Sequence, residues 1–130
     1  MGDNYKGGFE DLEVWKEARN YRKTISEIVK KFPSEEKYKL VDQLLRSSRS
    51  VHANIAEGYG RFHYQENIQF CRQARGSLME TIDHLICAHD ETYINDETLK
   101  KFREHYSLVL KLLNGYISFL KAKKSSTSLT

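Results

Sequence analysis

The sequence predicts an all-α protein, an up-down-up-down antiparallel bundle of four helices. Residues that interrupt helices are scarce, because the chain has one proline and seven glycines among 130 residues. Four segments carry apolar residues at alternating spacings of three and four, which is the period of one face of an α-helix. The connections between these segments are short, and short connections make consecutive helices antiparallel neighbours.

The first helix is expected to begin near Asp11 and to run to Phe32. Asp11 can cap its start, and Pro33 ends it because the residue before a proline is pushed out of the α region. Its apolar residues form one stripe, made of Val14, Trp15, Ala18, Tyr21, Ile25, Ile28, Val29 and Phe32.

The second helix is expected to begin at Ser34, with Glu35 and Glu36 in the first turn, where the helix dipole favours negative charge. Its predicted buried stripe consists of Leu40, Val41, Leu44, Leu45, Ser48, Val51, His52 and Ile55. Small residues are dense along this helix, which predicts that a neighbouring backbone approaches it closely.

The stretch "NIAEGYGR" ends the second helix with two glycines and an arginine. A phosphate-binding loop places its glycines between a strand and a helix N-terminus, whereas here they follow a helix. We therefore interpret Gly58 as a helix stop in the left-handed conformation, with Gly60 extending the turn. Arg61 has two interpretations, because a cation after a helix can bind the free carbonyls or face a ligand.

The third helix is expected from about Tyr64 to His89, and the fourth begins at Asn95 or Asp96, either of which can cap it. The inner face of the third helix consists of Ile68, Cys71, Ala74, Leu78, Ile82 and Leu85. The seam of the fourth consists of Leu99, Phe102, Tyr106, Val109, Leu113, Tyr116 and Leu120. This spacing is typical of an antiparallel bundle.

The fourth helix carries a second apolar stripe of Leu108, Leu112 and Phe119, beside the first. One apolar stripe is enough to pack a helix in a monomeric bundle. A second stripe therefore indicates that another surface of the helix is also covered by protein. We expect these three residues to form an oligomer interface. The alternative is a wide core face.

The bundle is expected to span residues 9–124, after a flexible N-terminus at 1–8 and before a disordered polar tail at 125–130. The two cysteines fit no disulfide framework, which is typical of reduced thiols. No apolar run is long enough for a membrane span, and the N-terminus lacks a signal-peptide pattern. We therefore expect a cytoplasmic protein with no membrane association.

The net charge of +3 is unevenly distributed, since residues 95–124 contain seven basic and three acidic side chains. This imbalance permits binding to a polyanion without requiring it. The candidate nucleic-acid or subunit contacts are Arg46, Arg49, Arg61, Lys121, Lys123 and Lys124. The plainer interpretation of the arginines is a solvated face with intrahelical ion pairs such as Asp42–Arg46. The plainer interpretation of the three lysines is that they complement the dipole of the fourth helix. Arg46 and Arg49 share one face of the second helix with Ala53 and Glu57. The small residues between these arginines slightly favour a packed subunit interface over an open nucleic-acid groove.

Glu80, His84, Cys87 and Glu91 share a face of the third helix directed away from its apolar stripe. They are metal-ligand types, but a bundle metal site needs convergent inward ligands from several helices. We expect no metal and no cofactor, and expect Glu80 to pair with an arginine of a neighbouring helix. The sequence lacks the common nucleophile, zinc and phosphate-loop motifs, so we expect no enzymatic activity.

Three stretches together resemble a known family: "FEDLEVWKEAR", "FPSEEKYKLVDQLLRSSRSVHANIAEGYGR" and "ARGSLMETIDHL". They look like the four-helix proteins first noticed in intervening sequences of 23S ribosomal RNA genes, often labelled S23 ribosomal proteins. The resemblance covers roughly Phe9 to Lys121. The residues that match the family's motifs are Asn54, Glu57, Gly58, Gly60, Arg61, Gly76, Ser77 and Glu80.

The resemblance implies a four-helix bundle that assembles as a homopentameric ring. One branch of the family, the accessory protein of diversity-generating retroelements, partners a reverse transcriptase and binds nucleic acid through a basic surface. We therefore expect a non-enzymatic, homo-oligomeric scaffold that binds RNA or DNA, or a nucleic-acid enzyme such as a reverse transcriptase. The alternative is a protein-binding adaptor with no nucleic-acid role, and a metal-dependent bundle enzyme is a distant third.

Overall fold

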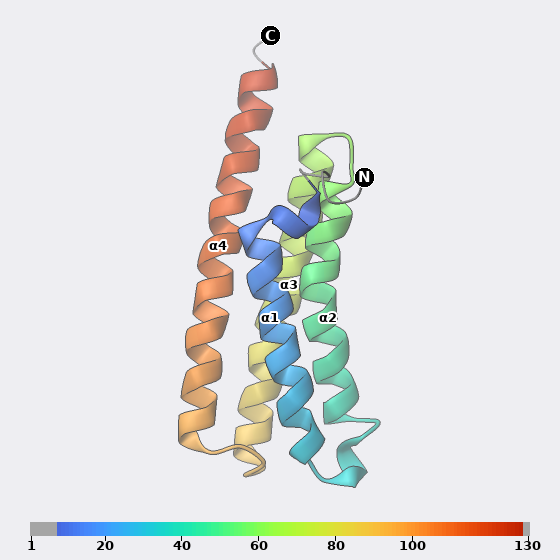
Figure 1. The fold of residues 1–130 in the computed structure, drawn as a ribbon, viewed down its shortest axis with the longest axis vertical. Helices are drawn as coiled ribbons and strands as arrows, with labels where there is room; N and C mark the ends of the chain where they lie inside the picture. Colours follow the sequence, from blue (N-terminus) through green and yellow to red (C-terminus); the bar gives the residue numbers. More distant parts are fainter. Residues whose placement is uncertain (1–7, 129–130) are drawn as a thin grey trace.

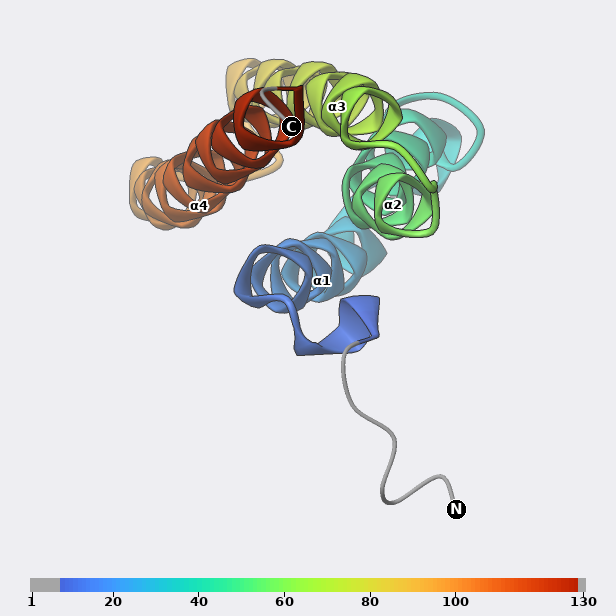
Figure 2. The same cartoon turned by 90° about the horizontal axis from the view of Figure 1, so that it is seen from above.

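The computed structural model describes residues 8–128 and confirms the all-α four-helix bundle (Figure 1). Its α-helices are α1 (Glu13–Ile28), α2 (Leu40–Tyr59), α3 (Tyr64–Asp90) and α4 (Asp96–Ser128). In the described part of the chain, the 3₁₀ turn η2 (Phe9–Asp11) precedes α1, and the turns η3 (Val29–Lys31) and η4 (Ser34–Glu36) lie in the connection between α1 and α2. Seen from above, the helices follow one another around the bundle in chain order (Figure 2). No helix in the described part of the chain is both long and apolar enough to cross a membrane.

The predicted stripes meet in one core. The largest side chains with almost no exposed surface are Tyr21, Ile25, Leu44, Ile55, Ile68, Leu78, Leu85 and Leu113. The Tyr21 hydroxyl lies 2.7 Å from the Thr81 hydroxyl, so this buried polar group keeps a hydrogen-bond partner. Burial raises the pKa of Tyr21 far above its usual range. Tyr21 therefore stays neutral.

Helices α2 and α3 pack through small residues, as the composition of α2 predicts. Ser47 and Ser48 are buried, and their hydroxyls donate to carbonyls of the preceding turn of α2. Ser77 of α3 donates to Ser50 of α2 at 2.9 Å, and Asn54 donates to both the carbonyl and the hydroxyl oxygen of Ser50. Because these polar groups bond one another, the two backbones approach closely without orphaned donors.

The first helix begins near Asp11 as predicted, but the predicted capping residues of the first two helices are wrong. Asp11 lies in η2, and Leu12 is the residue that precedes α1. Ser34 lies in the separate turn η4, while α2 begins six residues later at Leu40. The Glu36 carboxylate accepts from the Leu40 backbone amide at 3.3 Å, so a side chain from the connection satisfies this helix start. Before Pro33, the chain tightens into η3 instead of continuing as α-helix.

The left-handed assignment of Gly58 is also wrong. α2 continues through Tyr59, and Gly58 is a buried residue within the helix, without a positive φ. A Cβ at this position would lie 2.6 Å from the Asn67 Oδ1 atom and 2.9 Å from the Phe70 Cβ atom of α3. Gly58 is therefore required because α3 packs against its α-carbon. The helix ends at Gly60, with an ordinary negative φ of −76°.

Helix α4 is the longest element and extends past the others at its C-terminal end (Figure 1). Asn95 caps it as predicted, because its Oδ1 accepts from the Thr98 backbone amide at 2.8 Å. The helix includes residues 125–128, where the sequence predicted a disordered tail. Residues 129–130, like residues 1–7 of the predicted flexible N-terminus, lie outside the described residues.

Candidate nucleic-acid interface

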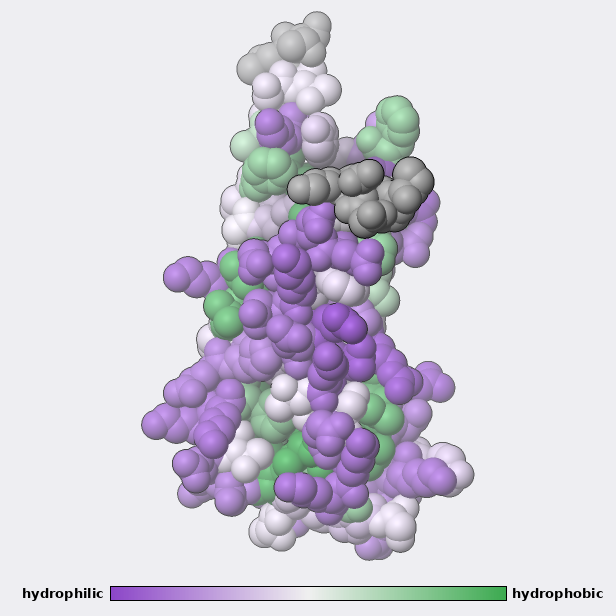
Figure 3. All heavy atoms as spheres, in the orientation of Figure 1, coloured by the Kyte–Doolittle hydropathy of each residue, from purple (hydrophilic) through white to green (hydrophobic). Residues whose placement is uncertain are grey.

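Three arginines gather on the surface shared by α1 and α2, and we call them the arginine cluster: Arg19, Arg22 and Arg49. Arg22 donates from Nε to the Nε2 atom of His52 across the two helices, at 3.3 Å. The Arg19 guanidinium carbon lies 5.7 Å from the centroid of the Trp15 ring. Hydrophilic side chains cover the middle of the face over α1 (Figure 3).

Helical spacing explains why these side chains meet. Trp15 and Arg19 are one turn apart on α1, and Arg22 follows three residues later, so the three share a face. Arg49 and His52 have the same spacing on α2. Arg19 and Arg49 are exposed, and Arg22 is partly buried.

The cluster concentrates positive charge. Within residues 8–128, no carboxylate lies within ion-pair distance of its three guanidinium groups. Burial, and after it the charges of Arg22, Arg19 and Arg49, together lower the pKa of His52 from 6.5 to about 4. His52 is therefore neutral at pH 7, and its Nε2 can accept the hydrogen bond from Arg22.

Trp15 is packed and does not offer an open stacking surface. The Phe9 ring meets it edge-on at 5.0 Å between centroids, and the His52 ring at 6.1 Å. Its indole Nε1 is buried without a hydrogen-bond partner among the described residues. The site can therefore contact phosphates through guanidinium groups, but nothing in it is arranged to stack or read bases.

The structure separates the candidate residues of α2. Arg46 is highly exposed and pairs with Asp42 at 3.1 Å, which confirms the predicted intrahelical pair. Arg49 belongs to the arginine cluster. The sequence interpretation missed Arg19 and Arg22, although their spacing from Trp15 places them at the edge of the apolar stripe.

The remaining candidate cations lie at the end of the bundle where α2 meets α3. Arg61 pairs with Glu57 at 2.9 Å, and its guanidinium carbon lies 4.8 Å from the centroid of the Phe70 ring of α3. Lys124 donates to Gln65 in the first turn of α3, so the basic end of α4 is nearby. Lys121 and Lys123 are exposed, with the Lys123 amine 5.6 Å from the Phe119 ring centroid.

The residues that match the family motifs have mainly packing roles. Asn54 and Ser77 join α2 to α3, Gly58 allows the close approach, and Gly60 ends α2. Gly76 is exposed, with open space around it.

Glu80 pairs with His84 of its own helix at 3.2 Å. The predicted ion pair between Glu80 and an arginine of a neighbouring helix is therefore wrong. Cys87 and Glu91 are exposed, and no group of three or more metal-ligand side chains converges anywhere in residues 8–128.

The second stripe of α4 is divided between core and surface. Leu112 is partly buried and packs against the core, in agreement with the wide-core interpretation for this residue. Leu108 and Phe119 are 43% and 52% exposed. Hydrophobic patches are visible over α4 (Figure 3).

Comparison with known proteins supports the resemblance. The sequence model of the family described as 23S rRNA-intervening sequence protein matches residues 10–115. A crystal structure from Bacteroides thetaiotaomicron, of a protein with unknown function from the S23 ribosomal protein family, has the same fold with a TM-score of 0.74 and 24% identity. The alignment covers 81% of this chain and 95% of that chain. Among curated proteins, none matches the sequence significantly. The chain therefore belongs to the family of 23S rRNA-intervening sequence proteins.

Proposed function

We propose that this protein is an oligomeric, non-enzymatic scaffold that binds nucleic acid through phosphate contacts. The observation that carries the proposal is the arginine cluster, three guanidinium groups whose charges all act on His52 and which have no carboxylate partner among the described residues. Guanidinium groups present several N–H donors in a geometry that suits phosphate oxygens. Such contacts hold a nucleic-acid backbone without reading its sequence.

Assembly would strengthen this binding. A single chain with a net charge of +3 is expected to bind weakly. In a ring, the arginine cluster repeats around an axis, and several weak contacts act together through their effective concentration. The exposed Leu108 and Phe119 are the surface that we propose for the contact between protomers, and the family resemblance favours five of them.

The test is a fluorescence-anisotropy titration of labelled single-stranded RNA and duplex DNA. We expect binding at about 50 mM salt that falls steeply toward about 200 mM, because phosphate contacts release counterions. The double variant Arg19→Gln/Arg49→Gln should weaken binding of both nucleic acids to a similar extent and reduce the salt dependence. Preference among sequences should be slight.

The double variant Arg72→Gln/Arg103→Gln is the matched control, since both arginines are exposed and lie outside the cluster, on α3 and α4, and it loses the same two charges. A control variant that binds as weakly as the cluster variants would show that only total charge matters. Absence of binding to either nucleic acid, with the oligomer intact, would favour the alternative of an adaptor that binds a protein such as a reverse transcriptase.

A further inference from the structure

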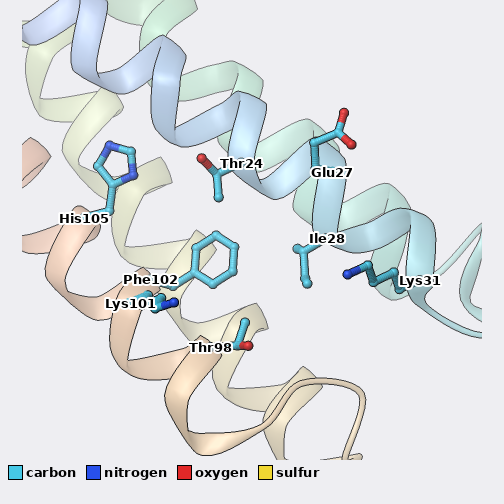
Figure 4. Close-up of a pocket in the computed structure, with 8 residues that line it drawn as sticks. All are labelled: Thr24, Glu27, Ile28, Lys31, Thr98, Lys101, Phe102 and His105. Carbon is cyan, nitrogen blue, oxygen red and sulfur yellow. The ribbon is translucent and has the colours of Figure 1, made fainter.

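A groove of about 360 Å³ lies between α1 and α4, at the end of the bundle where α1 finishes and α4 begins (Figure 4). Its volume is in the range of small-molecule sites. Eight residues line it, Thr24, Glu27, Ile28, Lys31, Thr98, Lys101, Phe102 and His105. None of them belongs to the arginine cluster.

The centre of the groove is apolar. Phe102 is only 4% exposed, and Ile28 is partly buried and packs against the core beside it. In Figure 4 the Phe102 ring and the Ile28 side chain stand between the two backbones, with Thr24 and Thr98 above and below them. An apolar chain or ring placed here would cover hydrocarbon that water now contacts.

Two lysines flank this apolar centre from opposite helices, Lys31 after α1 and Lys101 on α4 (Figure 4). Neither lysine has an ion-pair partner among the described residues. The carboxylate of the groove, Glu27, pairs with Lys30 at 3.0 Å.

His105 is also engaged, because it lies 3.1 Å from Glu17 of α1. Among the described residues, the charged groups of this groove without an ion-pair partner are therefore the ammonium groups of Lys31 and Lys101, beside an apolar surface.

We propose that this groove binds a small amphipathic anion, a carboxylate attached to an aliphatic body of roughly eight to twelve carbons. The body lies against Phe102 and Ile28, and the carboxylate lies between Lys31 and Lys101. Charge complementarity supports this occupant over a neutral apolar molecule, which would leave both ammonium groups unpaired. The volume of the groove suits a small molecule, whereas the flanking lysines are too few to track a nucleic-acid backbone.

The experiment uses octanoate as the probe and octan-1-ol as its neutral counterpart. Titration is followed by calorimetry and by the methyl resonances of Ile28 in an NMR spectrum of the full chain. We expect saturable octanoate binding that shifts the Ile28 methyl signals, with an affinity about tenfold higher than that of octan-1-ol at low salt. Exposed ion pairs contribute modestly, so Lys31→Gln and Lys101→Gln should each weaken octanoate binding about threefold to fivefold.

The neighbouring lysines give matched controls that lose the same charge. Lys23→Gln and Lys100→Gln should leave octanoate affinity within about twofold of the unmodified protein, since neither residue lines the groove or pairs with Glu27. The proposal is overturned by an absence of saturable binding or by equal affinities for octanoate and octan-1-ol. It is also overturned if the control variants weaken binding as much as Lys31→Gln and Lys101→Gln do. None of these outcomes depends on whether nucleic acid binds to the arginine cluster.

Discussion

At the scale of single residues, Gly58 sets how closely α2 and α3 approach. Replacing it with alanine places a Cβ 2.6 Å from the Asn67 Oδ1 atom, and Asn67 is itself held by a hydrogen bond to the Tyr116 hydroxyl. The clash therefore cannot be relieved by moving Asn67 alone. We expect Gly58→Ala to lower the free energy of unfolding by about 1–3 kcal/mol, measured by urea denaturation.

Gly76→Ala is the matched control. Gly76 is also within a helix, but a Cβ there meets nothing within 4 Å. Alanine should therefore raise stability by about 0.5–1 kcal/mol, because glycine is the poorer helix former. If Gly58→Ala behaved like Gly76→Ala, the close contact with α3 would not constrain the fold.

His52 should make stability depend on pH. Its pKa of about 4 in the folded protein lies below 6.5, the ordinary value expected in the unfolded chain. Between these values the unfolded state binds a proton that the folded state does not. This contribution to stability is complete above pH 6.5 and is lost as the pH falls toward 4. We expect the loss from pH 7 to pH 5 to be about 1–2 kcal/mol.

Comparison with His52→Gln isolates this contribution, because the other histidines remain and glutamine can still accept from Arg22. The variant should lose less stability than the unmodified protein between pH 7 and pH 5, as followed by thermal unfolding in matched buffers. Parallel pH profiles would mean that burial and the arginine charges do not lower the pKa of His52.

At the scale of elements, Glu36 links two connections of the bundle. Its carboxylate accepts from the Leu40 backbone amide at the start of α2 and from the Tyr93 hydroxyl in the α3–α4 connection, the latter at 2.7 Å. The hydrogen bond to Glu36 is the main cause that raises the pKa of Tyr93 to about 12, and burial adds to it. Both contacts hold the same end of the bundle together.

Glu36→Ala should therefore lower the free energy of unfolding by about 1 kcal/mol, since an amide and a hydroxyl lose a charged acceptor. Glu35→Ala removes an equal charge from an exposed neighbour and should change stability by less than about 0.5 kcal/mol. Chemical denaturation of both variants tests this, and equal effects would attribute the loss to charge rather than to the two hydrogen bonds.

The stripes were predictable from the sequence, whereas several element ends were not. The buried residues within each helix recur with the helical period, as Leu44 and Val51 do on α2. Burial, also of Leu78 on α3 and Val109 on α4, follows directly from that period. Ser34 has the side chain of a cap, but it lies in η4, six residues before α2 begins, and Glu36 satisfies the helix start instead. Such ends depend on contacts between connections, which local spacing does not contain.

The candidate site was predictable only in part, for a related reason. Arg49 is recognisable as a cation on the outer side of α2, and the Asp42–Arg46 pair follows from spacing alone. The cluster of Arg49 with Arg19 and Arg22 depends on which sides of α1 and α2 face each other. Gly58 was misread because a glycine at a helix end and a glycine at a close contact look alike in one sequence.

At the scale of the whole molecule, the exposed apolar residues of α4 should determine assembly. Leu108 and Phe119 are about half exposed, whereas Leu112 packs against the core, so a charge at Leu112 would disturb folding as well as assembly. We therefore expect Leu108→Glu and Phe119→Glu to reduce the oligomer mass while leaving the circular-dichroism spectrum and the unfolding transition nearly unchanged.

Light scattering after size-exclusion chromatography measures this mass, which should be several times the chain mass of 15.3 kDa for the unmodified protein. Ser118→Glu is the control, because Ser118 is an exposed residue beside Phe119 on the sequence but about 100° away around the helix. It should keep the oligomer. A monomeric unmodified protein at micromolar concentration would contradict the assembly itself, and an intact oligomer of Leu108→Glu and Phe119→Glu would move the interface to another surface. One face of α4 packs on α1 and α3 and completes the bundle. The adjacent apolar residues, Leu108 and Phe119, stay exposed in the single chain and are expected to contact a second copy.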